Sequence, residues 1–347
     1  MALPDRLPEP RTPDPMDAPP LRWGVLGTGW VAERFAGALV AGTRQQLYAV
    51  GSRSLSTARA FGARHGGRHG APAAYGSYED LVVDPDVDVV YVATPHNHHH
   101  AHARLALEAG KHALVEKPMG LSAGEVRDLA ALAQERGLFC MEALWTLFLP
   151  KFDVVRQVLE EGLLGEVHAV LADMGEHFEP DHRIWRADLV GGPLMDLGTY
   201  PLTLATWVLG APEQVCATGS FNAEGLNTQA AIDLRTAAGQ LAALHVTQLG
   251  NTPTRATVQG GDATLEIDGL FYQPGPFTLR GVDGTVLHWD EERLAHLGGL
   301  HFQAAEVARR VGEGETGSPL RPLSDTVAYL EVMDEVRRQV GITYPGA

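Results

Sequence analysis

Apolar runs of strand length alternate with amphipathic stretches along the first 145 residues. One such run opens the segment 21–41, and others are found at 46–54, 88–93 and 112–115. The stretches between them place apolar residues three and four positions apart, as an amphipathic helix does. Because strands that alternate with helices pair in parallel, the pattern predicts a doubly wound parallel α/β sheet.

The pattern changes after about residue 145. Several short alternating strands with tight turns predict a largely antiparallel sheet, because antiparallel neighbours can be joined by a short hairpin. The other predicted elements of this half are a strand at 166–174 and helices at 151–161, around 194–209, 301–312 and 323–340. The chain is therefore expected to combine a Rossmann sheet with an α+β domain built on a largely antiparallel open sheet.

The domain boundaries follow from these two patterns. Residues 21–145 are predicted to form a Rossmann dinucleotide-binding domain, and residues 146–347 an α+β domain for substrate binding and oligomerisation. The first 20 residues lack an apolar core and are crowded with proline, so they are not typical of a signal peptide. We expect residues 1–20 to form a flexible or extended Pro-rich tail.

The composition excludes several classes of partner. The 347 residues carry a formal net charge of −16. Such a surface repels phosphate backbones and anionic lipid, so nucleic acid and membrane surfaces are not expected partners. No apolar run reaches the ~18–20 residues needed to span a bilayer. Two cysteines, Cys140 and Cys216, offer no disulfide framework, which fits a cytoplasmic protein.

The segment VLGTGWVA has the pattern G-x-G-x-x-A and joins the first predicted strand to the first predicted helix. Glycines in such a turn let the backbone approach a pyrophosphate, whose charge is favoured at a helix N-terminus. An ordinary strand–helix turn is the alternative, but the position in the chain favours a dinucleotide site. The candidate contacts are Gly27, Thr28, Gly29, Trp30 and Val31.

The end of the second predicted strand indicates which dinucleotide is bound. NAD sites usually place an acidic residue there for the ribose 2′-hydroxyl. This chain has Ser52 and Arg53 instead. An arginine can pair with a 2′-phosphate, so NADP(H) is favoured, with NAD(H) still possible. The alternative is that Arg53 is an ordinary solvated surface residue.

Two further segments carry candidate chemistry. Glu116 and Lys117 end a strand of the parallel sheet, where ligands of such sheets bind, although a surface ion pair between them is the alternative. Asp196 and Tyr200 are four residues apart, so one continuous helix would place them on the same face. Pro201 predicts a kink or a helix start near residue 199. The alternative is that Asp196 caps a helix and Tyr200 packs in the core.

With these motifs, the chain resembles the glucose–fructose oxidoreductase / inositol dehydrogenase / MocA (Gfo/Idh/MocA) family over about residues 21–345. It is most similar to the branch with dimeric dihydrodiol dehydrogenase and glucose–fructose oxidoreductase. The resemblance rests on GTGWVAERFA, TPHNHHHAHA, LEAGKHALVEKP, MEALWTLFLP, GGPLMDLGTYP and SPLRPLSDTVAYLEVMDEVRRQVGITYP.

The resemblance implies a role for each candidate. Lys117 contacts the substrate and the nicotinamide ribose, and the bond from Lys117 to Pro118 is often cis in the family. Tyr200 is the acid/base, where many members have histidine, and Asp196 is the nearby orienting carboxylate. One position departs from the pattern, because Leu147 stands where relatives often carry arginine.

The histidine-rich segment TPHNHHHAHA follows a strand of the parallel sheet. In the family pattern T-P-x-x-x-H, His99 is the matching histidine, and Thr94, Pro95 and Asn97 would shape the turn beside the nicotinamide. A metal site needs three or four ligands at fixed geometry, which this loop is not expected to supply. We therefore predict no metal, with the other histidines of the segment in solvent.

These features predict an NAD(P)-dependent oxidoreductase that transfers hydride between nicotinamide C4 and a secondary alcohol or carbonyl. The expected substrate is a small molecule, namely a sugar, polyol or cyclic diol, and candidate substrate contacts are Trp145, Arg183, Trp185 and Arg186. A free tyrosine is a poor base because its pKa is near ~10, so Lys117 and the nicotinamide cation would stabilise the phenolate of Tyr200.

Other functions stay open at this stage. The chain could be an imine or inositol-type reductase, an enzyme with a tightly held cofactor, a non-catalytic dinucleotide-sensing regulator, or an NAD-using glycosidase. The joint presence of Lys117, Asp196 and Tyr200 argues against a regulator, which needs no acid/base. The family resemblance also implies a homodimer or homotetramer that uses the open face of the second sheet.

Overall fold

The computed structural model describes residues 3–67, 69–290 and 297–344. The chain forms two compact units, each described here by itself. The parallel-sheet unit comprises Pro13–Phe148 and Leu297–Thr326, and the mixed-sheet unit comprises Met1–Thr12, Leu149–His296 and Val327–Ala347. The predicted division was contiguous in sequence. The units differ from it because helix α9 (Leu300–Gly312) packs against helix α1 (Trp30–Gly42) of the parallel-sheet unit.

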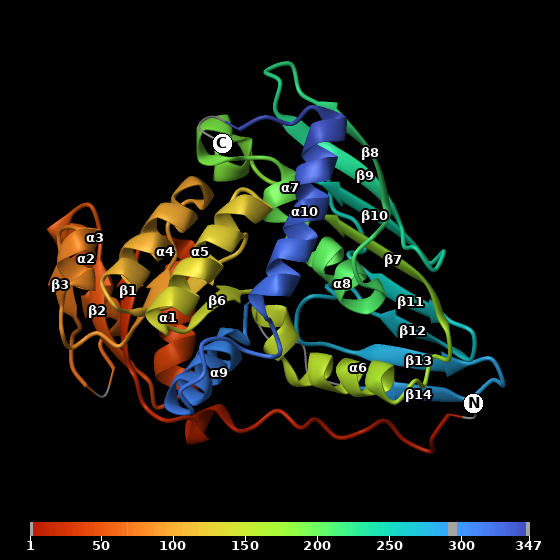
Figure 1. Cartoon of the computed structure of the whole chain (residues 1–347), viewed down its shortest axis with the longest axis horizontal. Helices are drawn as coiled ribbons and strands as arrows, with labels where there is room; N and C mark the ends of the chain where they lie inside the picture. The colour runs from red at the N-terminus through yellow and green to blue at the C-terminus, as the bar shows by residue number, and fades with distance from the viewer. Residues whose placement is uncertain (1–2, 68, 291–296, 345–347) are drawn as a thin grey trace. The chain divides into compact units, whose positions relative to one another are not determined.

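The described part of the parallel-sheet unit holds a six-stranded sheet with the order β3-β2-β1-β4-β5-β6 (Figure 1). Every neighbouring pair in it is parallel. The strands are β1 (Arg22–Leu26), β2 (Gln46–Gly51), β3 (Ala73–Tyr75), β4 (Val89–Val92), β5 (His112–Glu116) and β6 (Cys140–Ala143). The predicted doubly wound sheet is therefore confirmed.

Helices separate these strands, as the alternating pattern predicts. They are α1, α2 (Leu55–His65), α3 (Tyr78–Val82), α4 (His99–Glu108), α5 (Ala123–Arg136) and the single turns η2 (His96–His98) and η3 (Trp145–Phe148). Helix α1 packs on α2, and α4 packs on α5. The strand order reverses between β1 and β4, and ligands of open α/β sheets bind beyond the carboxyl ends of the strands at such a point.

The mixed-sheet unit is built on an eight-stranded sheet with the order β14-β13-β12-β11-β7-β10-β9-β8 among the described residues. Strands β10 and β7 are parallel, and the other pairs are antiparallel, so the predicted largely antiparallel sheet is confirmed. The strands are β7 (Val167–Gly175), β8 (Gln214–Phe221), β9 (Asn227–Arg235), β10 (Leu241–Thr247), β11 (Ala256–Gly260), β12 (Ala263–Ile267), β13 (Phe277–Gly281) and β14 (Val286–Trp289).

The helices of this unit are α6 (Pro150–Glu160), α7 (Pro193–Asp196), α8 (Thr199–Leu209) and α10 (Leu323–Val340), with single turns η4 (Arg183–Trp185) and η5 (Ala187–Leu189). Helix α8 packs on β7 and β10, and α7 packs on β9 and β10. Along β7 and β10 buried and more exposed residues alternate, so one face of the sheet packs under the helices and the other is open.

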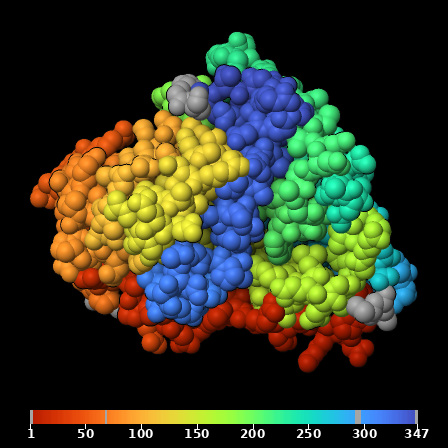
Figure 2. Space-filling model, viewed as in Figure 1, coloured from red at the N-terminus to blue at the C-terminus, as the bar shows by residue number. Residues whose placement is uncertain are grey.

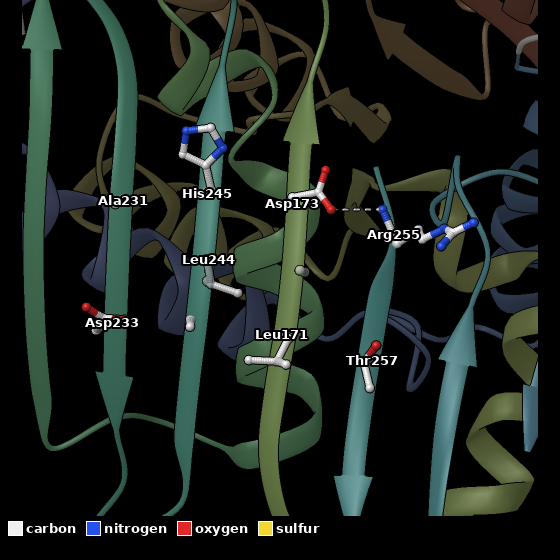
Figure 3. A pocket seen from close by; sticks show the side chains of 10 residues that line it. Leu171, Asp173, Ala231, Asp233, Leu244, His245, Arg255 and Thr257 are labelled. Atoms are coloured by element: carbon white, nitrogen blue, oxygen red, sulfur yellow. Dashed lines mark hydrogen bonds between the residues drawn. The ribbon is translucent and has the colours of Figure 1, made fainter. Parts of the chain in front are cut away.

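A shallow hollow of about 380 Å³ lies on this open face, as Figure 3 shows. Its lining includes Leu171, Ala243, His245, Asp233 and Thr257. It is not a candidate for the chemistry of Tyr200, because α8, which carries that residue, packs on the same strands through their buried side chains.

The amino-terminal segment from residue 3 to residue 20 follows an extended path over the surface, interrupted by a single turn η1 (Pro15–Asp17) (Figures 1 and 2). Within the mixed-sheet unit, Arg11 contacts Asp153 through its backbone and its guanidinium. Within the parallel-sheet unit, Ala18 is buried against helix α9. The segment is extended, which is one of the two conformations expected from its sequence. The other expectation, that it is flexible, stays a prediction.

Candidate functional site

The glycine turn between β1 and α1 has the geometry of a phosphate cradle. Gly27 has a φ of 103°, and a Cβ atom there would lie 2.5 Å from the carbonyl oxygen of Ala93, so only glycine fits. Gly29 is the N-cap of α1, has no side-chain cap, and would point a Cβ into open space. The first amides of the helix are therefore left without a side-chain partner, and a pyrophosphate fits this place.

The other residues of the turn are partly or largely exposed. Trp30, the first residue of α1, is 56% exposed, and the guanidinium of Arg34 lies over its ring. Thr28 and Val31 are half-buried beside it. These side chains border the turn without closing it.

The residues after β2 carry no acidic side chain. Ser52 is buried and donates its amide to the carbonyl of Tyr75, whereas Arg53 is exposed. Burial raises the pKa of Tyr78, and the nearby Arg53 guanidinium opposes that change. Arg53 therefore lies next to an aromatic side chain at the edge where the 2′ position of an adenine ribose is expected.

The loop after β4 brings its polar groups inward. Thr94 is buried and Pro95 is exposed. The buried Oδ1 atom of Asn97 has no hydrogen-bond partner among the described residues. A buried unsatisfied amide oxygen in a native protein calls for a partner, and a hydroxyl or amide of a bound cofactor would supply one.

The five histidines of this loop have different environments. His99 is fully buried, with Nδ1 2.7 Å from the Pro118 carbonyl oxygen and Nε2 2.7 Å from the Thr94 carbonyl oxygen. His102 contacts the Thr94 hydroxyl, and burial, followed by the charge of His98, lowers the pKa of His102 to about 4. His96 is also buried, so the expectation that the histidines other than His99 face solvent is wrong for that residue.

No group of three or more His, Cys, Asp or Glu side chains in the described ranges has an arrangement that could hold a metal ion. His98 and His102 lie with their ring centroids 5.4 Å apart, one helical turn from each other. A pair of imidazoles falls short of the three or four protein ligands of a typical zinc site.

The turn after β5 is fixed by buried side chains at consecutive residues. The Lys117–Pro118 bond is cis, as the resemblance implies. Glu116 is buried rather than open to a cofactor, and it accepts the Tyr91 hydroxyl and the Lys117 amide. Burial raises the pKa of Glu116 to about 7, and the hydrogen bond from Tyr91 opposes that change. Lys117 itself is half-buried at the carboxyl end of the strand.

Glu142, at the end of β6, binds the backbone of Met119, the residue that follows Pro118 in the same turn. Its carboxylate accepts the Met119 amide at 3.0 Å, and it is also bound by the Arg321 guanidinium at 2.6 Å and the Thr326 hydroxyl at 3.3 Å. Glu142 and Arg321 are both fully buried. Sequence reasoning missed this pair. Only the position of Glu142 at a strand end could have indicated it, since Arg321 lies 179 residues further along the chain.

In the mixed-sheet unit, Asp196 and Tyr200 do not share one continuous helix. Helix α7 ends at Asp196 and α8 begins at Thr199, so the predicted helix start near 199 is confirmed and the helical i, i+4 argument does not apply. Gly198, between the two helices, approaches the Leu194 carbonyl so closely that a Cβ atom would lie 2.4 Å from its oxygen, so only glycine fits there.

The two side chains nevertheless have defined partners. Asp196 accepts two hydrogen bonds from the Arg183 guanidinium, each at 3.0 Å. Tyr200 is buried and packs on the ring of Tyr272, with the centroids 4.4 Å apart. Tyr272 comes from the loop after β12, and no sequence signal indicated it.

The remaining substrate candidates lie in varied surroundings. Trp185 donates its indole N–H to the Phe178 carbonyl, and Arg186 is exposed and paired with Asp188. Trp145 and Leu147, in the parallel-sheet unit, are both buried. Neither side chain is exposed to a substrate in that unit taken by itself.

Two family models match the chain. The model described as an oxidoreductase family with an NAD-binding Rossmann fold matches residues 21–144, and the model of the Gfo/Idh/MocA C-terminal domain matches residues 152–266. The chain belongs to the Gfo/Idh/MocA oxidoreductase family. The resemblance inferred from the sequence motifs is therefore confirmed, and so is the assignment as an oxidoreductase with an NAD(P)-binding Rossmann domain.

Relatives of this family cover almost the whole chain. A trans-1,2-dihydrobenzene-1,2-diol dehydrogenase of Bos taurus is 34% identical over 336 residues, which is 94% of this chain and 98% of that protein. The human protein of the same name is 32% identical over 335 residues, with the same shares of the two chains covered.

Solved structures of the family have the same fold. A 3-ketoreductase from Actinomadura kijaniata, in complex with NADP and TDP-benzene, has a TM-score of 0.80 at 28% identity and covers 93% of this chain and 98% of that one. A UDP-N-acetylglucosamine 3-dehydrogenase from Acidithiobacillus ferrooxidans has a TM-score of 0.78 at 22% identity, with the same coverage, and this likeness concerns the fold alone. No described helix is long and apolar enough to cross a membrane.

Proposed function

We propose that this protein is an NADP(H)-preferring dehydrogenase or reductase of CH–OH groups, acting on a cyclic diol or a sugar. The observation that carries the proposal is the carboxyl edge of the parallel sheet. The uncapped start of α1 and the rigid turn with Lys117 both lie at that edge. A dinucleotide bound in the usual manner of this fold runs along the same edge.

The cofactor contacts follow from the residues described there. Gly27 and Gly29 admit the pyrophosphate, Arg53 pairs with a 2′-phosphate, and the Asn97 amide oxygen accepts a hydrogen bond from the nicotinamide half. Nicotinamide, when bound, supplies the carbon that accepts or donates hydride. The absence of an acid next to Ser52 removes the repulsion that a 2′-phosphate would meet.

Tyr200 is the proposed acid/base. In oxidation its phenolate takes the proton of the substrate hydroxyl, and in reduction its phenol returns the proton to the developing alkoxide. An ordinary tyrosine has a pKa near ~10, so it needs a nearby cation to serve as a base at neutral pH. Lys117 is the proposed cation. The proposal requires both side chains to reach one bound substrate.

The substrate class rests on the relatives and on the charges beside Tyr200. The similarity to the proteins named dihydrodiol dehydrogenases extends over 98% of their length. Arg183 is paired with Asp196, and Arg186 with Asp188, so each of these cations already has a carboxylate partner. A neutral diol or sugar suits such a site better than a substrate that carries a diphosphate.

Replacement of Tyr200 by phenylalanine tests the proposal. Tyr200→Phe keeps the ring that packs on Tyr272 and removes only the proton-transferring group. We expect kcat for trans-dihydrodiols or aldoses to fall by roughly 10²–10⁴-fold, the usual contribution of general acid–base catalysis. NADPH affinity, measured by fluorescence titration, should stay unchanged and exceed NADH affinity. Near-normal turnover of the variant would show that Tyr200 is not the acid/base.

We also propose that the chain forms a homodimer or homotetramer through the open face of the eight-stranded sheet. Leu171 and Leu241 are about half-exposed on strands β7 and β10, and alanine and leucine side chains make up half of the residues that line the hollow between the strands. Exposed apolar patches of this kind are typical of subunit contacts. Light scattering of the wild type and of Leu171→Glu gives the oligomeric state directly, and the substitution should release monomers.

A further inference from the structure

The ring of His99 has an environment that a neutral imidazole does not satisfy. Both ring nitrogens lie 2.7 Å from backbone carbonyl oxygens, Nδ1 from Pro118 and Nε2 from Thr94. A carbonyl oxygen only accepts hydrogen bonds. A neutral imidazole has one N–H and one lone pair, so one of the two contacts would set a lone pair against an oxygen.

We propose that His99 is a doubly protonated imidazolium that donates to both carbonyls and thereby positions Lys117. Two N–H donors match two acceptors, and both distances are those of charge-assisted hydrogen bonds, which are shorter than the ~2.9–3.0 Å of neutral N–H···O contacts. Because the side chain is 1% exposed, water cannot replace either contact.

The two carbonyls belong to two different loops at the carboxyl edge. Thr94 follows β4, and Pro118 follows β5 in the turn that presents Lys117. His99 therefore ties the loop with the cofactor candidates to the turn with the proposed catalytic lysine. Three successive residues of that turn are then held through the backbone, by Glu116 at Lys117, His99 at Pro118 and Glu142 at Met119.

The charged groups on the elements packed near His99 have both signs. Glu142 and Glu116 hold the residues on either side of Pro118, and Arg321 pairs with Glu142. Lys117 stands directly before Pro118. It is the positive charge on that element, so it opposes the protonation of His99. From α4 and its preceding turn, the His96 ring lies 5.4 Å from the His99 ring, and His102 contacts the hydroxyl of Thr94.

This proposal rests on the proposed function for the role of Lys117, but the protonation state can be measured without any substrate. The intact wild-type protein would be labelled with ¹⁵N at the histidine rings and followed by long-range ¹H–¹⁵N correlation spectra. The pH would run from about 6 to about 8, which spans the ordinary histidine pKa of ~6.5. His99 would be assigned by its loss in His99→Gln, or by elimination through replacement of the other histidines.

The expected spectrum shows both His99 ring nitrogens protonated over the whole range. One unprotonated His99 nitrogen at neutral pH overturns the proposal. The elimination route needs no His99 variant, so it decides the protonation state even if His99→Gln does not fold.

Kinetics of the variant then test the positioning role. His99→Gln cannot donate to both carbonyls, because its side chain offers donors at one end only. We expect kcat to fall on the order of tenfold or more, with a smaller change in the NADPH dissociation constant. His100→Gln is the matched control on the same helix, since His100 bonds the partly exposed Asp128 instead of the backbone.

The outcomes separate the two proposals. A protonated His99 with an unchanged kcat in His99→Gln overturns the positioning role. A wild type that turns over no diol or sugar contradicts the proposed function, and the spectrum still reports on His99 in that case.

Discussion

The two units hold their candidate chemical groups in different ways. In the parallel-sheet unit, buried ionisable side chains bind the backbone around Lys117, and the Glu142–Arg321 pair is closed to solvent. In the mixed-sheet unit, the Arg183–Asp196 pair joins two side chains, and the Arg183 side chain is 42% exposed. The first arrangement fixes a turn of the main chain, and the second orients one carboxylate.

The difference has an energetic consequence. A buried pair gains stability only when every charge keeps its partners, because an unpaired charge cannot recover its hydration. A partly exposed pair loses little when one partner is removed, since water takes the vacant place. Substitutions that remove one partner of the Glu142–Arg321 pair should therefore lower the stability, whereas substitutions at Arg183 should change the reaction with little effect on the fold.

Arg321→Met has the largest expected effect on stability. It leaves the Glu142 carboxylate buried with the Met119 amide and the Thr326 hydroxyl but without its cation. We expect the free energy of unfolding to fall by about 3–5 kcal/mol, the usual cost of breaking a buried pair. Urea unfolding followed by far-UV circular dichroism measures it.

Two further variants show whether the buried charge is the cause. In the double variant Glu142→Gln/Arg321→Met no charge is left, and glutamine can still accept the Met119 amide, so about half or more of the lost stability should return. Arg338→Met removes an exposed cation whose partner, Glu335, is partly exposed, and its effect should be close to zero. A double variant as unstable as Arg321→Met alone would contradict this account.

Glu116 has the next largest expected effect, and it depends on pH. Burial raises the pKa of Glu116 to about 7 from an ordinary 4.5, so between these values the folded protein keeps a proton that the unfolded chain has released. Because the folded state then binds more protons, this group makes the protein less stable as the pH rises from 4.5 to 7. Relative to wild type, Glu116→Gln should gain up to roughly 3 kcal/mol over that window and nothing more above it.

The partly exposed Glu335 provides a control of opposite sign. Its hydrogen bonds with Arg338 and Gln339 lower the pKa of Glu335 to about 2, so its contribution is present above the ordinary value and is lost as the pH falls toward 2. Glu335→Gln should show no gain between pH 4.5 and 7. The same pH dependence in both variants would mean that burial of Glu116 is not the cause.

The sequence predicts the parallel-sheet unit better than the other unit, for a physical reason. Its fold follows from local signals: apolar runs, helix spacing and the glycine turn at Gly27 all act within a few residues. The open sheet was also predicted in type, because alternation and short turns are local. The start of α8 near Thr199 was foreseen from Pro201, yet the break at Gly198 separates Asp196 from the helix that carries Tyr200.

The contacts between distant segments were not predictable in this way. Arg321 reaches Glu142 across 179 residues, and Tyr272 meets Tyr200 from a loop with no motif. The grouping of residues 297–326 with the first sheet was not predictable for the same reason, because α9 packs on α1 through tertiary contacts. Among the candidate residues, Glu116 was expected to lie at the cofactor, whereas its buried carboxylate accepts the Tyr91 hydroxyl.

The smallest expected change in stability is that of Arg183→Leu, and it completes the comparison. Because Arg183 is 42% exposed, the free energy of unfolding should change by no more than about 1 kcal/mol. Asp196, the proposed orienting carboxylate, would lose the cation that holds both its oxygens at 3.0 Å. We expect kcat/KM to fall about tenfold, a loss of roughly 1.4 kcal/mol of transition-state stabilisation, with unchanged NADPH affinity. Arg338→Leu, in the same unit and paired with the partly exposed Glu335, is the matched control and should keep its activity. If Arg183→Leu lost several kcal/mol of stability instead, the Arg183–Asp196 pair would support the fold as the buried Glu142–Arg321 pair does, and the contrast between the two units would not hold.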